Sequence, residues 1–173
     1  GIAKTVRSLS NLLKNLAKGT GYKITLAQEI SLLQDYADTQ SIRFMEMFEL
    51  QNDIEPDLLQ YRIVKFTLQP LVENAIFHGI EPSEGCGVIR LWAEEEEDDL
   101  LLMVEDNGVG MTEEELGRLM KAAENPHPGG MASIGVANVN NRLKLTYGAQ
   151  YGLSYQSEVG QFTRVTIRIP KEE

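Results

Sequence analysis

The first part of the chain carries apolar residues at helical spacing. Between residues 2 and 16 they are separated alternately by four and three positions, as in a heptad seam: Ile2, Val6, Leu9, Leu13 and Leu16. The segment Lys-Gly-Thr-Gly at 18–21 ends this pattern, and Thr25 with Gln28 forms a capping box that predicts the start of a second helix. We interpret residues 1–43 as part of a helical, dimerising element.

Beyond residue 43 the pattern predicts a mixture of strands and helices. The last strand shows the clearest alternation, with Val165, Ile167 and Ile169 on one face. We expect strands at 44–52, 88–93, 100–106, 152–156 and 161–169, and helices at 67–80, 112–123 and 137–147. Grouped in this way, the elements favour an α+β fold, a two-layer sandwich in which a mixed sheet has helices on one face.

Composition narrows the class of protein. The 173 residues include 16 Lys and Arg against 26 Asp and Glu, a net charge of −10, which argues against a nucleic-acid-binding protein because such proteins neutralise phosphates with basic residues. The longest aliphatic run, 100–104, is too short to span a bilayer, so we expect no membrane contact by these residues. The single cysteine, Cys86, fits a reducing, cytoplasmic setting. The first residue is Gly1, which suggests a fragment of a longer protein.

Two other features have simple structural interpretations. The acidic run 94–99 is predicted to be a solvated hairpin tip, because adjacent like charges repel one another. Trp92 is predicted to pack on a strand rather than to stack on a nucleic-acid base, since Arg90 is the only basic residue near it in the sequence.

A first segment with potential chemistry lies in the predicted helix 67–80. Asn74, Phe77 and His78 stand at positions i, i+3 and i+4, on one side of that helix. Asparagine is a poor helix former, and its amide oxygen is a ligand that Mg²⁺ accepts alongside phosphate oxygens. Taken alone, Asn74 would be interpreted as a surface residue.

Two further segments are rich in glycine. At 106–110, a predicted strand ends in Asp106 and is followed by Gly108 and Gly110; such a carboxylate can accept a hydrogen bond from an exocyclic amine such as that of adenine. At 129–139, a glycine-containing loop leads into a helix N-terminus, an arrangement that binds phosphate through backbone N–H groups. Alone, the first would be interpreted as a turn, and the second is equally compatible with an ordinary surface loop.

In this order the three segments resemble the N-box, G1-box and G2-box of the Bergerat ATP-binding fold. More narrowly, residues 68–79 (LQPLVENAIFHG) and 138–148 (NVNNRLKLTYG) resemble the catalytic domain of LytS/YesM-type bacterial sensor histidine kinases. Residues 6–13 and 25–30 resemble the helices that follow the phosphoacceptor histidine in that family. The resemblance therefore covers nearly the whole chain. It divides the chain into a partial helical dimerisation and phosphotransfer region, 1–43, and an ATP-binding catalytic domain, 44–173.

The resemblance implies a role for each motif residue. Asn74 would hold Mg²⁺ at the ATP phosphates, and His78 would lie beside those phosphates. Asp106 would bind the adenine amino group. The remaining implied contacts are made by the glycine segments: Gly108 and Gly110 toward the base, residues 124–134 as a lid over ATP, and Gly135 with Val136 toward phosphate.

The family's Asn-Pro-His-Phe phosphoacceptor segment is absent from these residues. The resemblance thus implies an ATP-dependent protein-histidine kinase whose γ-phosphoryl acceptor lies upstream, so that the fragment alone does not autophosphorylate. It also implies a response regulator as partner, a homodimer through the N-terminal helices, and a parent protein in the bacterial inner membrane with this domain in the cytoplasm. Two positions depart from the family: Phe77 replaces a frequent lysine, and Ser133 replaces a glycine.

Related Bergerat-fold ATPases place a carboxylate one helical turn before the metal-binding asparagine, where it activates water. Here that position is Pro70, which favours a kinase over a hydrolase. Glu73 is kept as a candidate base, although it lies about 100° around the helix from Asn74. The alternatives are another Bergerat-fold ATPase or serine kinase, and a non-catalytic helical dimer module with a degenerate nucleotide pocket.

Overall fold

The computed structural model describes residues 2–3, 6, 22–43, 47–124 and 131–173. Most of the predicted heptad seam lies outside these ranges, as do residues 44–46 of a predicted strand and residues 125–130 of the predicted lid. Within the described ranges, no helix is both long and apolar enough to cross a membrane.

A five-stranded mixed sheet forms one layer, with the strand order β2-β4-β5-β7-β6. β2 pairs in parallel with β4, and the other pairs are antiparallel. The strands are β2 (Phe48–Asn52), β4 (Gly87–Glu96), β5 (Asp99–Asp106), β6 (Gly152–Glu158) and β7 (Phe162–Pro170). Short 3₁₀ turns lie at Pro56–Leu58 and Glu81–Ser83.

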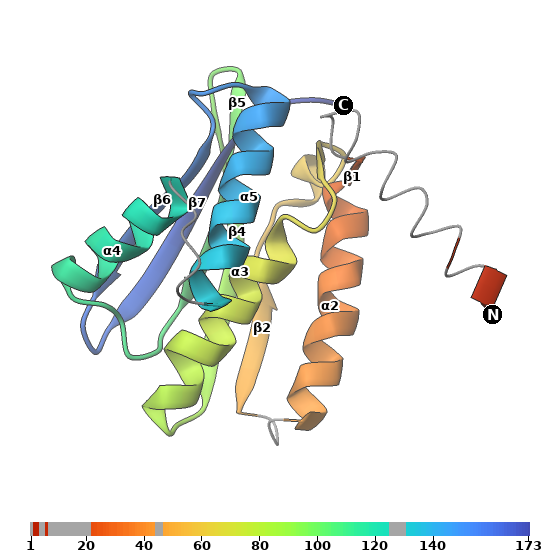
Figure 1. Ribbon diagram of the computed structural model, residues 1–173. Helices are drawn as coiled ribbons and strands as arrows, with labels where there is room; N and C mark the ends of the chain where they lie inside the picture. The colour runs from red at the N-terminus through yellow and green to blue at the C-terminus, as the bar shows by residue number, and fades with distance from the viewer. Residues whose placement is uncertain (1, 4–5, 7–21, 44–46, 125–130) are drawn as a thin grey trace.

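The helices lie together on one face of this sheet (Figure 1). They are α2 (Leu26–Arg43), α3 (Leu68–Asn74), α4 (Glu113–Glu124) and α5 (Met131–Tyr147). Their apolar residues and those of the inner sheet face form one core, so the predicted α+β sandwich with helices on one face is confirmed. As predicted, Gly148 ends α5: its φ is 122°, and its N–H donates to the carbonyl of Lys144 at 2.9 Å.

The strands alternate as the sequence indicates. Val165, Ile167 and Ile169 of β7 are buried beneath the helices, while the residues between them face the opposite side. On that opposite face Trp92 stacks with two guanidinium groups, 4.7 Å from Arg90 and 5.3 Å from Arg164. Trp92 is therefore a strand-packing residue, as predicted.

The acidic run 94–99 lies at the tip of a hairpin, as predicted, but the strands reach further into it than expected. β4 continues to Glu96 and β5 begins at Asp99, so only two residues form the turn. Arg168 of β7 pairs with Asp99 at 2.7 Å and with Glu96 at 3.2 Å. Glu95 accepts a hydrogen bond of 2.7 Å from the Tyr61 hydroxyl. Residues 94–98 are exposed, so the predicted solvated hairpin tip is confirmed, although neighbouring side chains pair with three of its acids.

The helix α2 belongs to the same core as the sheet. Its capping box forms as predicted: the Thr25 N–H donates to Gln28 Oε1 at 3.0 Å and the Gln28 N–H donates to Thr25 Oγ1 at 3.2 Å. Leu33 and other apolar residues of α2 are buried against the sandwich. A small sheet that the sequence did not predict, β1 (Lys23–Thr25) antiparallel to β3 (Arg62–Val64), also joins this part of the chain to the rest. The division at residue 43 stays a prediction.

Candidate functional site

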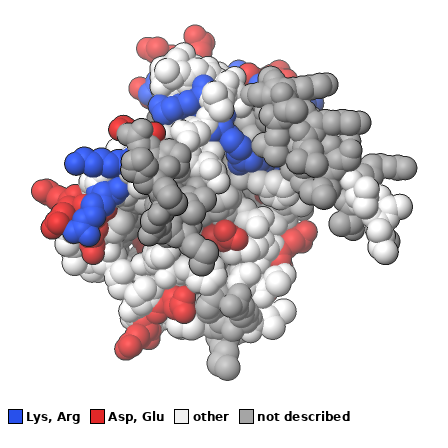
Figure 2. Space-filling model, in the orientation of Figure 1, with Lys and Arg blue, Asp and Glu red and all other residues white. Residues whose placement is uncertain are grey.

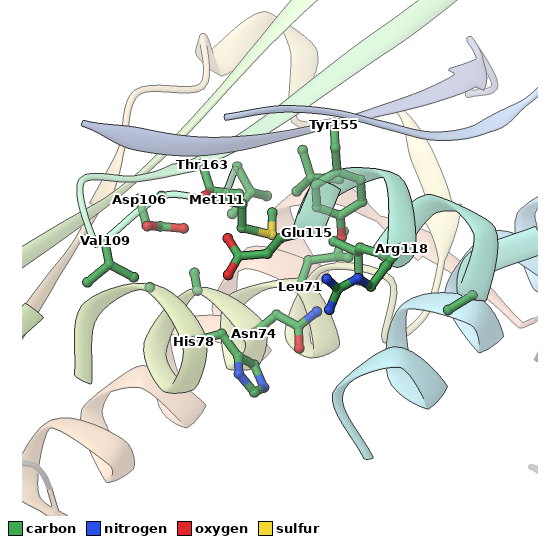
Figure 3. A pocket seen from close by; sticks show the side chains of 17 residues that line it. Leu71, Asn74, His78, Asp106, Val109, Met111, Glu115, Arg118, Tyr155 and Thr163 are labelled. Carbon is green, nitrogen blue, oxygen red and sulfur yellow. The ribbon is translucent and has the colours of Figure 1, made fainter. Parts of the chain in front are cut away.

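A cavity of about 620 Å³ lies between the sheet, α3 and α4. Four of the predicted site residues line it: Asn74, His78, Asp106 and Gly110. Figure 3 shows Asn74 and His78 on one wall and Asp106 near the strands on the other. The structure thus brings the first two of the three predicted motifs together in one pocket.

The wall that carries Asn74 is a helix whose geometry changes along its length. The sequence predicted a single helix at 67–80, but α3 ends at Asn74 and a π-helical segment, Ala75–Ile80, follows. Hydrogen bonds from i to i+5 make such a segment wider than an α-helix. Asn74 is half-buried and His78 is exposed, and both line the cavity together with Gly79.

Asp106 is a buried carboxylate at the end of β5, with only 4% of its surface exposed. Its Oδ1 accepts a hydrogen bond of 3.0 Å from the Gly108 N–H. Burial raises the pKa of Asp106 to about 6; Glu105 adds to the rise and the Gly108 N–H opposes it. A buried carboxylate with this pKa favours a ligand that donates a hydrogen bond to it.

The turn after Asp106 packs closely against the π-helical segment. The Val109 N–H donates to the Gly79 carbonyl at 3.0 Å, and a side chain at Gly108 would overlap the Gly79 backbone. Gly110 has a φ of 67°, and a side chain there would overlap the Glu158 carbonyl. Both glycines are required by the contact between the turn and its neighbours, and Gly110 also lines the cavity.

Several pocket residues were not predicted from the sequence. Thr163 lies two residues before Val165 and therefore on the same inward face of β7, and Tyr155 pairs with Val165 on that face. Strand alternation could therefore have identified both. The Tyr155 hydroxyl is buried without a hydrogen-bond partner among the described residues. Burial raises the pKa of Tyr155.

The helix α4 contributes one face to the cavity through Glu115, Arg118, Leu119 and Ala122. Their spacing of three and four residues is helical, so periodicity was the available signal for them as well. Glu115 also closes the predicted capping box by accepting the Thr112 N–H at 2.8 Å. Figure 2 shows acidic and basic side chains side by side over α4, where Arg118 pairs with Glu114 at 2.6 Å.

The structure does not bring the remaining predicted residues to this cavity. Gly135 lies inside α5 and lines a second groove, of about 510 Å³, together with Phe66 and Pro70. Val136 is fully buried in the core. Glu73 is half-buried on α3 and does not line the cavity. The roles predicted for Gly135, Val136 and Glu73 therefore stay predictions.

The predicted lid over 124–134 also differs in its backbone. The helix α5 begins at Met131 rather than at Ala137, so the last residues of that segment are helical. Ser133 is one of the two predicted departures from the family, and its side chain is not among those that the structure describes. Phe77, the other departure, is half-buried in the π-helical segment.

A family model described as histidine kinase-, DNA gyrase B- and HSP90-like ATPase matches residues 61–173. The chain therefore belongs to this ATPase family. Sensor histidine kinase YesM of Bacillus subtilis (strain 168) is 36% identical over 169 residues, which are 98% of this chain and 28% of the relative. Sensor protein LytS of Bacillus anthracis is 32% identical over 158 residues, 91% of this chain and 26% of the relative. The predicted resemblance to LytS/YesM-type sensor histidine kinases is confirmed.

Solved structures agree with this fold. The catalytic domain of histidine kinase ThkA superposes with a TM-score of 0.64 at 14% identity, covering 87% of this chain and 95% of that chain. Acinetobacter baumannii histidine kinase AdeS superposes with a TM-score of 0.59 at 15% identity, covering 99% of this chain and 82% of that chain. At these identities the likeness establishes the fold. The chain spans about 28% of the length of relatives such as YesM and BtsS.

Proposed function

We propose that this chain binds Mg-ATP in the cavity and serves as the catalytic domain of a protein-histidine kinase. The observation that supports this most directly is the composition of the cavity itself. It joins a buried carboxylate, Asp106, to an amide and an imidazole, Asn74 and His78, across apolar walls that include Val104 and Leu119. The buried carboxylate and the apolar walls suit a nucleotide base, and the amide and imidazole suit the phosphates with their metal.

The end of the cavity near Asp106 fits adenine. An ionised carboxylate accepts a hydrogen bond from the exocyclic amine, and the neighbouring Thr163 hydroxyl can donate to or accept from a ring nitrogen or a water. Apolar side chains beside Asp106 exclude water from the base. The close contact between Gly79 and the turn after Asp106 keeps this end of the cavity in place.

The opposite end fits the phosphates. The amide oxygen of Asn74 is a neutral oxygen ligand for Mg²⁺, which would take its other ligands from phosphate and water. When bound, Mg²⁺ neutralises charge that develops on the transferring phosphoryl group. His78 is exposed at this end, where its imidazole can contact a phosphate oxygen.

The residues on the helix around Asn74 favour a kinase over a hydrolase. Pro70, one turn earlier, supplies no base for water and faces the second groove, and Glu73 does not line the cavity. An acceptor imidazole outside these residues would attack the γ-phosphorus. As the new N–P bond forms, the bond from that phosphorus to the bridging oxygen breaks, ADP leaves and the imidazole gives up its proton.

The acceptor histidine and the partners are proposed from the relatives. The chain corresponds to 28% of the length of sensor histidine kinase YesM. We therefore propose that the phosphoacceptor histidine lies in a part of the parent protein that corresponds to the rest of that length. We propose transfer onward to a response regulator, a homodimer formed through the N-terminal helices, and a parent protein anchored in the bacterial inner membrane that holds this domain in the cytoplasm.

The proposal predicts phosphoryl transfer to a separately supplied acceptor. The chain is incubated with γ-labelled Mg-ATP and a protein that carries the Asn-Pro-His helix of a LytS/YesM-type kinase. We expect label on the acceptor that is lost in acid and retained in base, as for phosphohistidine, and none when the acceptor histidine is replaced by glutamine.

Other outcomes identify the alternatives. Acid-stable label would indicate a serine kinase. Inorganic phosphate released at the same rate without the acceptor would indicate an ATPase. Neither label nor phosphate release, with no binding of Mg-ATP, would leave the non-catalytic dimer module.

A further inference from the structure

Glu29 of α2 is a buried carboxylate far from the cavity in sequence, with 2% of its surface exposed. Its Oε2 accepts the Phe66 N–H at 3.1 Å and its Oε1 accepts the Leu68 N–H at 3.2 Å. Burial raises the pKa of Glu29, and these N–H groups, with that of Thr67 and with Arg142, oppose the rise. The carboxylate is therefore held by the backbone of another element.

Of the two N–H groups bonded to Glu29, that of Leu68 is the first of α3 and that of Phe66 lies two residues before the helix. The first N–H groups of a helix have no partner within it and need an acceptor from elsewhere. Thr67, directly before α3, makes no such cap, because its hydroxyl donates instead to the Val64 carbonyl at 2.5 Å. Glu29 therefore supplies the cap from α2, and its negative charge suits the positive end of the helix dipole.

Phe66, between β3 and α3, is held from a second side as well. It is a non-glycine residue with a φ of 63°, a backbone conformation that persists only where surrounding groups hold it. Arg142 of α5 donates from Nη2 to the Phe66 carbonyl at 2.9 Å. Through Phe66, then, α2 and α5 both fix the point at which α3 begins.

The position of the start of α3 affects the position of Asn74, the last residue of this helix. A short helix moves as a rigid body, so a shift at its first residue reaches its last residue, six positions on and about 9 Å along the axis. Metal ligands must be held within roughly half an ångström of their productive positions. The start of α3 therefore controls whether the Asn74 amide is in place.

We propose that Glu29 is a positioning residue for the metal end of the cavity, acting on Asn74 through the N-terminus of α3. The inference rests on the proposed function, since it takes Asn74 as the Mg²⁺ ligand. It also gives α2, which precedes the five-stranded sheet in the sequence, a direct structural connection to the phosphate end of the site. The adenine end is built on β5 and the turn after Asp106, and its hydrogen bond to this helical wall is made at Gly79, five residues beyond Asn74, so we expect it to depend less on this connection.

The test compares two ligands in the Glu29→Gln variant. Glutamine keeps the length of the side chain but loses its charge, and its amino group faces a backbone N–H. We expect affinity for Mg-ATP to fall about tenfold, as for groups that orient a metal ligand, while affinity for ADP in EDTA changes less than about twofold. Asp35→Asn is the matched control: it removes one negative charge from an exposed site on α2, and both affinities should match those of the unmodified chain.

Calorimetric titrations of the three chains separate the outcomes. An equal loss for both ligands would show that Glu29 only stabilises the fold, and no loss would show that Asn74 is positioned without it; either overturns the inference alone. If the unmodified chain shows no Mg²⁺ dependence of ATP binding, the proposed function fails together with the inference. Should Glu29→Gln not fold, Arg142→Lys, which keeps the charge but shortens the reach to Phe66, is expected to show the same selective loss.

Discussion

Replacing Asp106 with asparagine is expected to remove most of the affinity for ATP and to make the folded chain more stable at neutral pH. The two effects have one cause, the buried carboxylate. An asparagine that keeps its oxygen on the Gly108 N–H directs its amino group at the adenine amine, so that two donors face each other in the complex. We expect a loss of affinity of about 100-fold or more.

The gain in stability depends on pH in a defined direction. Folding raises the pKa of Asp106 from the ordinary 3.8 to about 6. Between these two pH values the carboxyl is therefore protonated in the folded chain and ionised in the unfolded chain. The stability of the unmodified chain therefore falls as pH rises from about 4 to about 6 and stays lower above that. Two pKa units correspond to at most about 3 kcal/mol, and Asp106→Asn should recover about 1–3 kcal/mol at pH 8 and little near pH 4.

Urea unfolding at pH 4 and at pH 8, with calorimetry for ATP, measures both effects on the same variant. Glu105→Gln is a useful control, because it removes the adjacent charge but leaves the buried carboxylate; it should shift the pH dependence slightly and keep ATP binding. An Asp106→Asn chain that is less stable at pH 8, or that binds ATP with unchanged affinity, would contradict the assignment of this carboxylate.

Replacing Gly108 with alanine is expected to destabilise the folded chain severely. A Cβ at Gly108 would overlap the backbone of Gly79, where no side chain can rotate away. The turn after Asp106 would have to move away from the π-helical segment, breaking the Val109–Gly79 hydrogen bond and opening the cavity. We expect a loss of about 3 kcal/mol or more in the free energy of unfolding, as for severe overpacking, and loss of ATP binding.

Gly117 offers a matched control for this substitution. It lies within α4, and a Cβ there meets nothing within 4 Å. Gly117→Ala should raise stability by about 0.5–1 kcal/mol, because alanine is the better helix former, and should leave ATP affinity unchanged. Thermal unfolding of the two variants side by side checks the pair. Equal effects of the two substitutions would show that Gly108 is not in close contact with Gly79.

The sequence predicted those parts of the fold and site that depend on local patterns. Strand alternation, both capping boxes and the glycine at the end of α5 are all present in the structure. The motifs around Asn74 and Asp106 were also identified, because packing alone does not explain an asparagine within a helix or a carboxylate before two glycines. These features involve residues close together in the chain.

What the sequence did not predict depends on contacts between distant segments. The π-helical turn at Ala75–Ile80 adjoins the turn at Gly108, and acids at the tip of the 87–106 hairpin pair with Arg168 in another strand. Glu29 looked like any polar residue of a surface helix, because its partners at Phe66 and Leu68 are 37 and 39 residues away. Such pairings have no periodic signal in a single sequence.

The central claim is that the Asn74 end of the cavity holds the metal and phosphates of ATP. Calorimetric titration of ATP, with and without Mg²⁺, into the unmodified chain and into Asn74→Ala tests it most directly. We predict that Mg²⁺ strengthens ATP binding to the unmodified chain and has no such effect on Asn74→Ala, which should still bind ADP in EDTA through the Asp106 end. Mg²⁺-dependent binding that is equally strong in both chains would contradict the claim.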